Sequence, residues 1–448
     1  MAGQLLSHGP VEPAQLLLRD VRVLDPRMGL DARRDVLVRD GKIAALAEAG
    51  SLGEPLQEIE LVDGRGRLLA PAFFDPHVHL RSPGQEHKED LRSGTRAAAA
   101  GGFGGVIAMP NTDPVIDSAP LLGSLREAAA REACVPVGFM AAITRGQRGE
   151  ELTEMAHLRA EGAVGFSDDG LPVASAGMLR KAMQYQRLCG GVLSLHEEDP
   201  TLSRDGCMRE GAVSAALGIG GIPSVSESTM VARDAELALY ESARAHFQHL
   251  SCAASVASVE RAKADGARVS CEVTPHHLLL TDESVRELDT RMKMNPPLAG
   301  EQDRRALVQA LRSGAIDCVA SDHAPHAREE KEVPFEQAPM GTTGLETAFP
   351  ALYTGLVLNG ELALDTLIER MTAGAALFEL PTATIAPGEP ANLTLIDLDA
   401  ELIAGEHGWE SRSENCCFAG RRLRGRVLLT LAAGGVVYRE PVFSVVAA

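Results

Sequence analysis

The amino-acid sequence predicts an α/β fold, a (β/α)8 TIM barrel with a small β-sandwich domain formed by both chain ends. The chain of 448 residues exceeds the size at which a single hydrophobic core stops growing. Short β-type runs occur at both ends, and apolar runs alternate with amphipathic helical segments between them. We expect residues 1–70 together with 376–448 to form the small domain, and residues 71–375 to form the barrel.

The predicted small domain rests on short runs of strand-forming residues that are separated by polar turns. The runs near the beginning of the chain are residues 15–23, 35–38, 43–45 and 59–62. The runs near its end are residues 391–397, 424–431 and 436–438. Because both groups are short β-type runs with polar turns, we expect both to contribute to one β-domain.

The predicted barrel rests on eight apolar runs with helical segments between them. The apolar runs are residues 68–74, 105–109, 135–141, 163–166, 191–195, 245–248, 268–273 and 316–320. The helical segments include residues 91–100, 120–131, 178–188, 228–244, 254–264 and 303–312. In such a barrel the residues that follow the strands meet at one end, where the chemistry takes place.

Composition excludes several classes of partner. The formal net charge of −19 argues against nucleic acid or an anionic membrane. No run of about 18 uncharged apolar residues offers a membrane span, and the first residues do not resemble a secretory signal. The eight cysteines form no C-x-x-C pair, so we expect reduced thiols in a cytoplasmic protein and no thiolate metal site.

Histidine and aspartate follow nearly every predicted barrel strand, although the chain has only 13 histidines. His77 and His79 are two residues apart, so an extended backbone places both side chains on one face. This pair alone is a weak signal. His196, His249 and Asp322 follow later strands and complete a set of nitrogen and oxygen ligands for one or two metal ions.

Several segments carry a resemblance to a known family. The stretch FFDPHVHLRSPGQEHKED resembles the opening signature of the amidohydrolase superfamily, and specifically of the dihydroorotases. Further segments resemble the type I (bacterial, long-chain) dihydroorotases in the same order, namely GGFGGVIAMPNTDP, FSDDGLPV, VTPHHLLLTD, MKMNPPL, ASDHAPH and GTTGLETAFPALY. The resemblance covers about residues 70–375, and the flanking β-segments fit the composite sandwich of that family.

The resemblance implies zinc-dependent, reversible hydrolysis of the cyclic amide of dihydroorotate, which in reverse closes N-carbamoyl-L-aspartate in pyrimidine biosynthesis. It also implies six ligands for one or two Zn²⁺ ions. These are His77, His79 and Asp322 on one ion, His196 and His249 on a second, and Asp169 between the two. Asp322 would in addition be the catalytic residue, which takes a proton from the attacking water and delivers it to the departing amide nitrogen.

The substrate carries a carboxylate, so an acidic protein needs a local positive charge to bind it. Arg81 lies two residues beyond His79 and is the expected bidentate partner. The resemblance implies further substrate-binding residues, namely Asn111, Asn295, His326, Met340 and Gly341.

Other polar residues near the strand ends are interpreted as structural. We expect Asp168 to be a turn residue and His276 and His277 to be supporting structure. His246 is expected to face the helix layer, and residues 88–90 are interpreted as the solvated start of a helix.

Two alternative functions remain. Hydantoinases and allantoinases of the same superfamily bridge their metals with a carboxylated lysine, whereas the corresponding stretch here, GAVGFSDDG, has no lysine. A non-catalytic homologue could instead serve as a scaffold for aspartate transcarbamoylase, but such homologues lack metal ligands that this sequence retains. We expect a homo-oligomer, and association with aspartate transcarbamoylase is compatible with an active enzyme.

Overall fold

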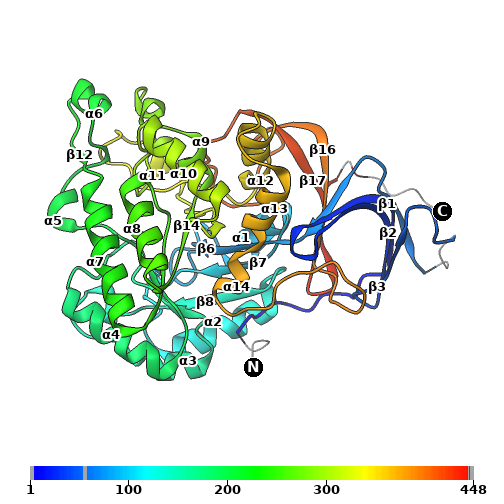
Figure 1. Ribbon diagram of the computed structural model, residues 1–448, viewed down its shortest axis with the longest axis horizontal. Coiled ribbons are helices and arrows are strands. Elements are labelled where there is room, and N and C mark those ends of the chain that lie inside the picture. The colour runs from blue at the N-terminus through cyan, green and yellow to red at the C-terminus, as the bar shows by residue number, and fades with distance from the viewer. Residues whose placement is uncertain (1–4, 54–57, 442, 444–448) are drawn as a thin grey trace.

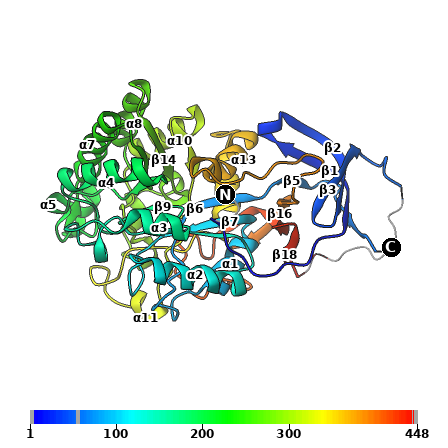
Figure 2. The same cartoon turned by 90° about the horizontal axis from the view of Figure 1, so that it is seen from below.

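The computed structural model describes residues 5–53, 58–441 and 443 (Figure 1). Its helix-rich part and a β-rich part lie side by side, as both views show (Figures 1 and 2). None of the helices within the described residues combines the length and apolar character needed to cross a bilayer.

The helix-rich part is a barrel of eight parallel strands, counted over the described residues, and each strand pairs with the next in chain order. The strands are β6 (Phe73–Val78), β7 (Phe103–Ala108), β8 (Val137–Ala141), β9 (Gly165–Phe166), β10 (Leu193–Leu195), β13 (Arg244–Phe247), β14 (Arg268–Val273) and β15 (Cys318–Val319). A parallel bridge between Val78 and His323 joins the last strand to the first. The predicted (β/α)8 architecture is therefore confirmed.

Helices follow the strands and cover the barrel (Figure 1). The longer ones are α1 (Leu91–Ala100), α2 (Ala119–Glu132), α3 (Met155–Glu161), α4 (Ala176–Cys189), α7 (Val225–Glu241), α8 (Ala253–Ala264), α10 (Glu301–Ser313) and α13 (Leu364–Thr372). Shorter elements are α5 (Pro200–Ser203), α6 (Ala212–Leu217), α9 (Pro275–Leu279), α11 (Arg328–Lys331), α12 (Ala348–Leu352), α14 (Gly374–Leu377), β11 (Met208–Arg209) and β12 (Gly221–Ile222). Local sequence sets these boundaries. For example, Asp90 caps α1 in a capping box with Ser93.

The β-rich part is one sheet built from both chain ends. Its strands are β1 (Leu16–Asp25), β2 (Leu30–Arg39), β3 (Lys42–Glu48), β4 (Glu60–Asp63), β5 (Leu68–Pro71), β16 (Leu393–Ile403), β17 (Arg422–Ala432) and β18 (Gly435–Arg439). The two ends meet where β5 pairs antiparallel with β16, and buried residues of these strands share one apolar cluster. The expected contribution of both ends is confirmed, although the strands form a single continuous sheet.

One predicted strand was wrong in its extent. The run 68–74 is two strands, because β5 belongs to the terminal sheet and the first barrel strand begins at Phe73. That barrel strand continues to Val78, so His77 lies within it and not after it. Since both strands are buried along their whole length, the apolar pattern does not reveal the break between them. We propose that the domain boundary lies at this break, with residues 1–70 and 376–448 on one side and 71–375 on the other.

The connection between β16 and β17, residues 404–421, leaves the terminal sheet and packs on the barrel. Buried Cys416 and Phe418 of this connection share an apolar cluster with Met294 and Phe335. The C-terminal part of the chain therefore reaches the end of the barrel where the candidate site lies.

Candidate metal centre and substrate site

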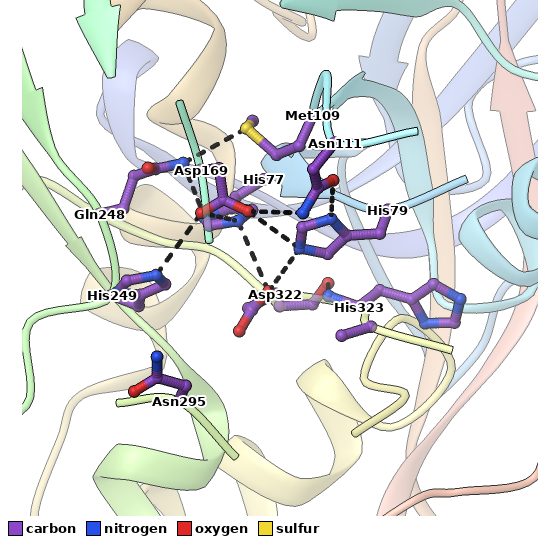
Figure 3. A network of polar contacts seen from close by, with 12 residues as sticks. His77, His79, Met109, Asn111, Asp169, Gln248, His249, Asn295, Asp322 and His323 are labelled. Atoms are coloured by element: carbon purple, nitrogen blue, oxygen red, sulfur yellow. Dashed lines mark hydrogen bonds and ion pairs between the residues drawn. The ribbon is translucent and has the colours of Figure 1, made fainter. Parts of the chain in front are cut away.

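The six expected metal ligands are buried and come from five barrel strands or the residues that follow them. His77 lies on β6 and His79 follows it, while the others follow β9, β10, β13 and β15. Figure 3 shows how closely His77, His79, Asp169 and Asp322 approach one another. The barrel topology thus brings together residues as far apart in the sequence as His77 and Asp322, because parallel strands end at one face.

The first group of side chains converges on Asp322. Nε2 of His79 lies 3.0 Å from Oδ1 of Asp322, and Nε2 of His77 lies 3.5 Å from the same oxygen. Asp169 faces the same two rings, with Oδ1 3.5 Å from Nε2 of His77 and Oδ2 3.5 Å from Nε2 of His79. These nitrogens and carboxylate oxygens lie close enough together to hold a metal ion.

A second group lies on the other side of Asp169. Nδ1 of His196 and Nε2 of His249 are 3.0 Å apart. Each of the two nitrogens lies 3.8 Å from Oδ1 of Asp169. The carboxylate of Asp169 therefore contacts both groups of histidines, as a bridging ligand must.

The residues of this centre fit a metal ion. Nε2 of His77 is buried and has no hydrogen-bond partner among the described residues, although it faces two carboxylates. A buried polar atom without a partner is costly, and a cation between the nitrogen and the carboxylates would satisfy all of them. Imidazole and carboxylate are ligands that zinc accepts. The donor set therefore matches the expected zinc site in its chemistry.

The charges of the centre depend on one another. Burial by itself raises the pKa of Asp169 and Asp322, but the charge of His77 and the contacts with the other neighbouring histidines together outweigh burial and lower the pKa of both carboxyls. Burial likewise opposes the charge on His77, yet Glu272, Asp169 and Asp322 raise its pKa well above the ordinary value. The surplus of buried carboxylates therefore favours a bound cation.

Buried partners orient the two histidines of β6. Nδ1 of His77 lies 2.6 Å from Oε1 of Glu272, and Nδ1 of His79 lies 2.9 Å from Oδ1 of Asn111. Each ring can donate its Nδ1 proton to that oxygen and keep Nε2 free for a metal. The sequence analysis missed Glu272, which alternates with buried apolar residues on β14 and carries no motif of its own.

The expectation for His246 is wrong. Its Nε2 lies 3.0 Å from Oε2 of Glu272, the carboxylate that also contacts His77, so the ring does not face the helix layer. Nδ1 of His246 lies 2.8 Å from Oγ of Ser270, so both ring nitrogens have partners. His246 therefore supports the centre through Glu272.

The expectation for residues 88–90 is wrong at Glu89. Its side chain is 0% exposed and contacts Nε2 of His323 at 3.2 Å. The hydroxyl of Ser411 and the backbone N–H of Arg412 also donate to Glu89. Glu89 thus links the start of α1 to the residue beside Asp322 and to the β16–β17 connection. Asp90 does cap the helix, as its position suggested.

Arg81 provides a positive charge beside the metal ligands. The residue is buried, and its Nε donates to the backbone oxygen of Pro325 at 3.1 Å. Burial lowers the pKa of the guanidinium. The negative charges of Asp322 and Asp169 raise this pKa, but by less than burial lowers it. Within the described residues the terminal nitrogens of Arg81 donate to no protein acceptor, so they are available to a carboxylate.

His326 belongs to the segment that follows β15. It directly follows Pro325, whose backbone oxygen accepts the hydrogen bond from Arg81. Its Nε2 donates to the backbone oxygen of Met340 at 2.8 Å, which places His326 against the Met340–Gly341 backbone. Burial, together with the positive charge of Arg81, lowers the pKa of His326 to about 2. The ring is therefore neutral at ordinary pH.

Three residues of the site have strained backbones. Arg81, His249 and Asp322 have φ angles of 57°, 31° and 46°, in the left-handed region that side chains other than glycine rarely adopt. Such strain persists only where the surroundings hold the residue in place, and it is concentrated at functional sites.

Comparisons with known proteins identify the family. The family model described as dihydro-orotase-like matches residues 66–256. A dihydroorotase from Anaeromyxobacter dehalogenans is 44% identical over 428 residues, which cover 95% of this chain and 98% of the relative. A dihydroorotase from Pelotomaculum thermopropionicum is 44% identical over 430 residues, which cover 96% and 99%. The chain belongs to the dihydroorotase family.

Solved structures with a similar fold come from the same superfamily. The L-hydantoinase (dihydropyrimidinase) from Arthrobacter aurescens has a TM-score of 0.85 at 25% identity, covering 97% of this chain and 98% of that one. The dihydropyrimidinase from Brevibacillus agri has a TM-score of 0.81 at 22% identity, with 95% of each chain covered, and supports the fold alone. Both similarities extend over nearly the whole chain, the barrel and the terminal sheet included.

Two of the residues that the dihydroorotase resemblance assigned to the substrate also contact metal ligands. Nδ2 of Asn111 donates to Oδ2 of Asp169 at 3.3 Å, in addition to the contact with His79. Nδ2 of Asn295 donates to Oε2 of Glu198 at 2.6 Å and lies 3.4 Å from Nε2 of His196. The side-chain amides of Asn111 and Asn295 therefore line the metal centre.

The remaining polar residues near the strand ends have structural contacts. Asp168 accepts hydrogen bonds from the backbone N–H groups of Ile143 and Thr144 at 2.8 and 3.1 Å, so it holds the loop after β8. His277 contacts the hydroxyl of Thr274 and the backbone oxygen of Pro296. These contacts agree with the supporting roles expected for both residues.

Proposed function

We propose that this member of the dihydroorotase family hydrolyses the cyclic amide of dihydroorotate and, in reverse, cyclises N-carbamoyl-L-aspartate. The observation that carries the proposal is the position of Asp169 between two histidine groups, with buried Arg81 beside them. An aspartate in this place differs from the carboxylated lysine expected of a hydantoinase. The names of the relatives, which match nearly the whole chain, support the same substrate.

We propose that the six ligands hold one or two zinc ions. His77, His79 and Asp322 would hold the first ion, His196 and His249 the second, and Asp169 would contact both. When bound, zinc polarises the attacked carbonyl and lowers the pKa of water that binds to it. The buried, converging ligands keep the reacting groups in place before the substrate arrives.

Asp322 is the proposed catalytic residue. Its carboxylate is ionised, because the neighbouring histidines lower its pKa, so it can accept a proton from the attacking water. It then delivers this proton to the amide nitrogen as the ring bond breaks. In the direction of ring closure the same carboxylate removes the proton from the carbamoyl nitrogen.

Arg81 is the proposed partner of the substrate carboxylate, because its terminal nitrogens form a planar pair of donors. We propose that the other residues named from the resemblance bind the ring. They are Asn111, Asn295, His326 and the Met340–Gly341 backbone. The contact between His326 and Met340 places these last two elements side by side.

Metal analysis of the purified protein, followed by assays on dihydroorotate, hydantoin and allantoin, tests the proposal. We expect bound zinc and turnover of dihydroorotate in both directions, with hydantoin and allantoin far poorer substrates. A preference for hydantoin would overturn the substrate assignment. A protein with neither zinc nor activity would instead support the scaffold alternative.

Assembly and location are further proposals. We propose a homo-oligomer in the cytoplasm, and association with aspartate transcarbamoylase as an additional role of an active enzyme. Light scattering on the purified protein measures its oligomeric state, and copurification with the transcarbamoylase measures the association.

A further inference from the structure

Asn415 lies far along the chain from the barrel strands, yet it is buried at the candidate site. It belongs to the β16–β17 connection and is 5% exposed. The apolar neighbours Cys416 and Cys417 are buried as well and fix this part of the connection on the barrel.

The side-chain amide of Asn415 joins two segments that carry proposed substrate-binding residues. Its Oδ1 accepts a hydrogen bond from the backbone N–H of His326 at 3.0 Å. Its Nδ2 donates to the backbone oxygens of Ala324 and Gly341, both at 3.1 Å. One N–H group and two carbonyl groups therefore determine which way the amide points, since only nitrogen can donate twice.

The backbone of Asn415 adds to the same link. Its carbonyl oxygen accepts from the backbone N–H of Thr343 at 3.3 Å and from the hydroxyl of Thr342 at 3.0 Å. The two joined segments also contact each other directly, through the His326–Met340 bond and a bond from the N–H of Ala324 to the oxygen of Thr342. Asn415 thus closes a compact polar network in which every side-chain atom of the amide has a partner.

We infer that Asn415 is a positioning residue that sets the distance and orientation of His326 relative to the Met340–Gly341 backbone, and so determines the affinity for the pyrimidine ring. The inference rests on the proposed function, because the ring is the ligand that the two segments would hold. Asn415 acts through its neighbours, because within the described residues its side chain hydrogen-bonds to the backbone of His326, Ala324 and Gly341 and to no metal ligand. Its effect should therefore fall on substrate binding and not on the chemical step.

Asn415→Asp tests this inference, because the variant keeps the size of the side chain and loses both N–H donors. Two buried carbonyl groups then lose their partner and face a carboxylate oxygen. We expect KM for dihydroorotate to rise about tenfold or more, while kcat of the zinc-loaded protein changes by less than about threefold. Asn415→Ala serves as a second variant without the added charge, and it should shift KM in the same direction.

Ser413→Ala is the matched control on the same connection. Ser413 is buried and its hydroxyl donates to the backbone oxygen of Lys88 at 2.7 Å, away from the two joined segments. This control should lose a comparable hydrogen bond and some thermal stability without a change in KM.

The outcomes separate the inference from the proposed function. A wild-type protein that does not turn over dihydroorotate contradicts the proposed function. A wild type that is active, with Asn415 variants whose KM is unchanged, overturns the inference. Variants that lose thermal stability and active fraction, but whose remaining zinc-loaded molecules have the wild-type KM, overturn it too, since Asn415 would then be merely structural.

Discussion

The buried carboxylates of Asp169 and Asp322 at the end of the barrel differ in their contacts although their surroundings are similar. Asp322 and Asp169 contact the same two histidines, but only Asp169 also contacts His196 and His249. Asp322 therefore needs to serve one metal position only, and its carboxylate is the one expected to exchange a proton with substrate.

Asp322→Asn tests the acid–base role. The amide cannot accept the proton of the attacking water, so we expect kcat to fall by at least about a thousandfold. The side chain keeps its size, so thermal unfolding and circular dichroism should stay close to wild type. Near-normal kcat in this variant would show that another residue moves the proton.

Arg81→Met tests the carboxylate clamp. Loss of a charged, bidentate partner should raise KM for dihydroorotate by about a hundredfold, which corresponds to about 3 kcal/mol. Dihydrouracil, which has the same ring without the carboxylate, provides the control, because its weak turnover should be little affected. An equal loss for both substrates would mean that Arg81 supports the site in some other way.

Glu272→Gln tests the charge on the carboxylate beneath His77. Burial raises the pKa of Glu272, but the charges of His77 and His246 and the hydrogen bonds to both rings together outweigh burial, and the pKa falls to about 2. A carboxylate with a lowered pKa stabilises the fold above its unfolded pKa of about 4.3, and this stability is lost as the pH falls toward 2.

For the metal-free protein we therefore expect wild type to be more stable than Glu272→Gln at pH 5, and this difference to shrink by about 2 kcal/mol at pH 3. Urea unfolding at several pH values measures the difference. A gap that stays constant over this range would contradict the assigned charge.

At the scale of elements, the loops that follow β6 and β7 fit together so closely that one position requires glycine. Gly84 has a φ of 92°, and a Cβ atom there would lie 1.8 Å from the backbone oxygen of Asp113. The N–H of Asp113 also donates to the oxygen of Pro83 at 3.1 Å. This contact holds the loop that carries Arg81 against the loop that carries Asn111.

Gly84→Ala should therefore separate the two loops and lower the free energy of unfolding by more than about 2 kcal/mol. Gly66→Ala is the control, since Gly66 has a φ of 74° but open space around the added Cβ. That variant should cost only about 1 kcal/mol of backbone strain. Equal losses of stability in the two variants, measured by denaturant unfolding, would show that steric contact with Asp113 is unimportant.

At the scale of the whole molecule, metal binding and folding are coupled, because the ligands come from strands at both ends of the barrel. Removal of metal with a chelator should abolish activity and lower the melting temperature by several degrees, since a ligand that binds only the folded state stabilises it. Added Zn²⁺ should restore both, and titration of the metal-free protein gives the number of ions. A melting temperature that does not respond to metal would contradict a site built from these six ligands.

The terminal sheet shows which parts of the fold can be predicted from sequence periodicity and which cannot. Short strands at both ends were visible in the sequence, as was the alternation of strands and helices between them. The break between β5 and β6 was not visible, because two buried strands in different sheets form one unbroken apolar run. The merging of all terminal strands into one sheet depends on the β5–β16 pairing, which local sequence does not specify.

The residue types and their order along the chain were sufficient to predict the kind of chemistry. It placed histidines and aspartates after parallel strands, and a parallel barrel must gather such residues at one end. The contacts of each side chain, in contrast, became visible only in the folded chain. Glu89 reads as a solvated residue at a helix start but is buried against His323, and Asn415 carries no motif yet lies between His326 and Gly341. Burial and hydrogen-bond partners depend on segments that are far apart in the sequence, whereas periodicity and motifs describe only neighbours along the chain.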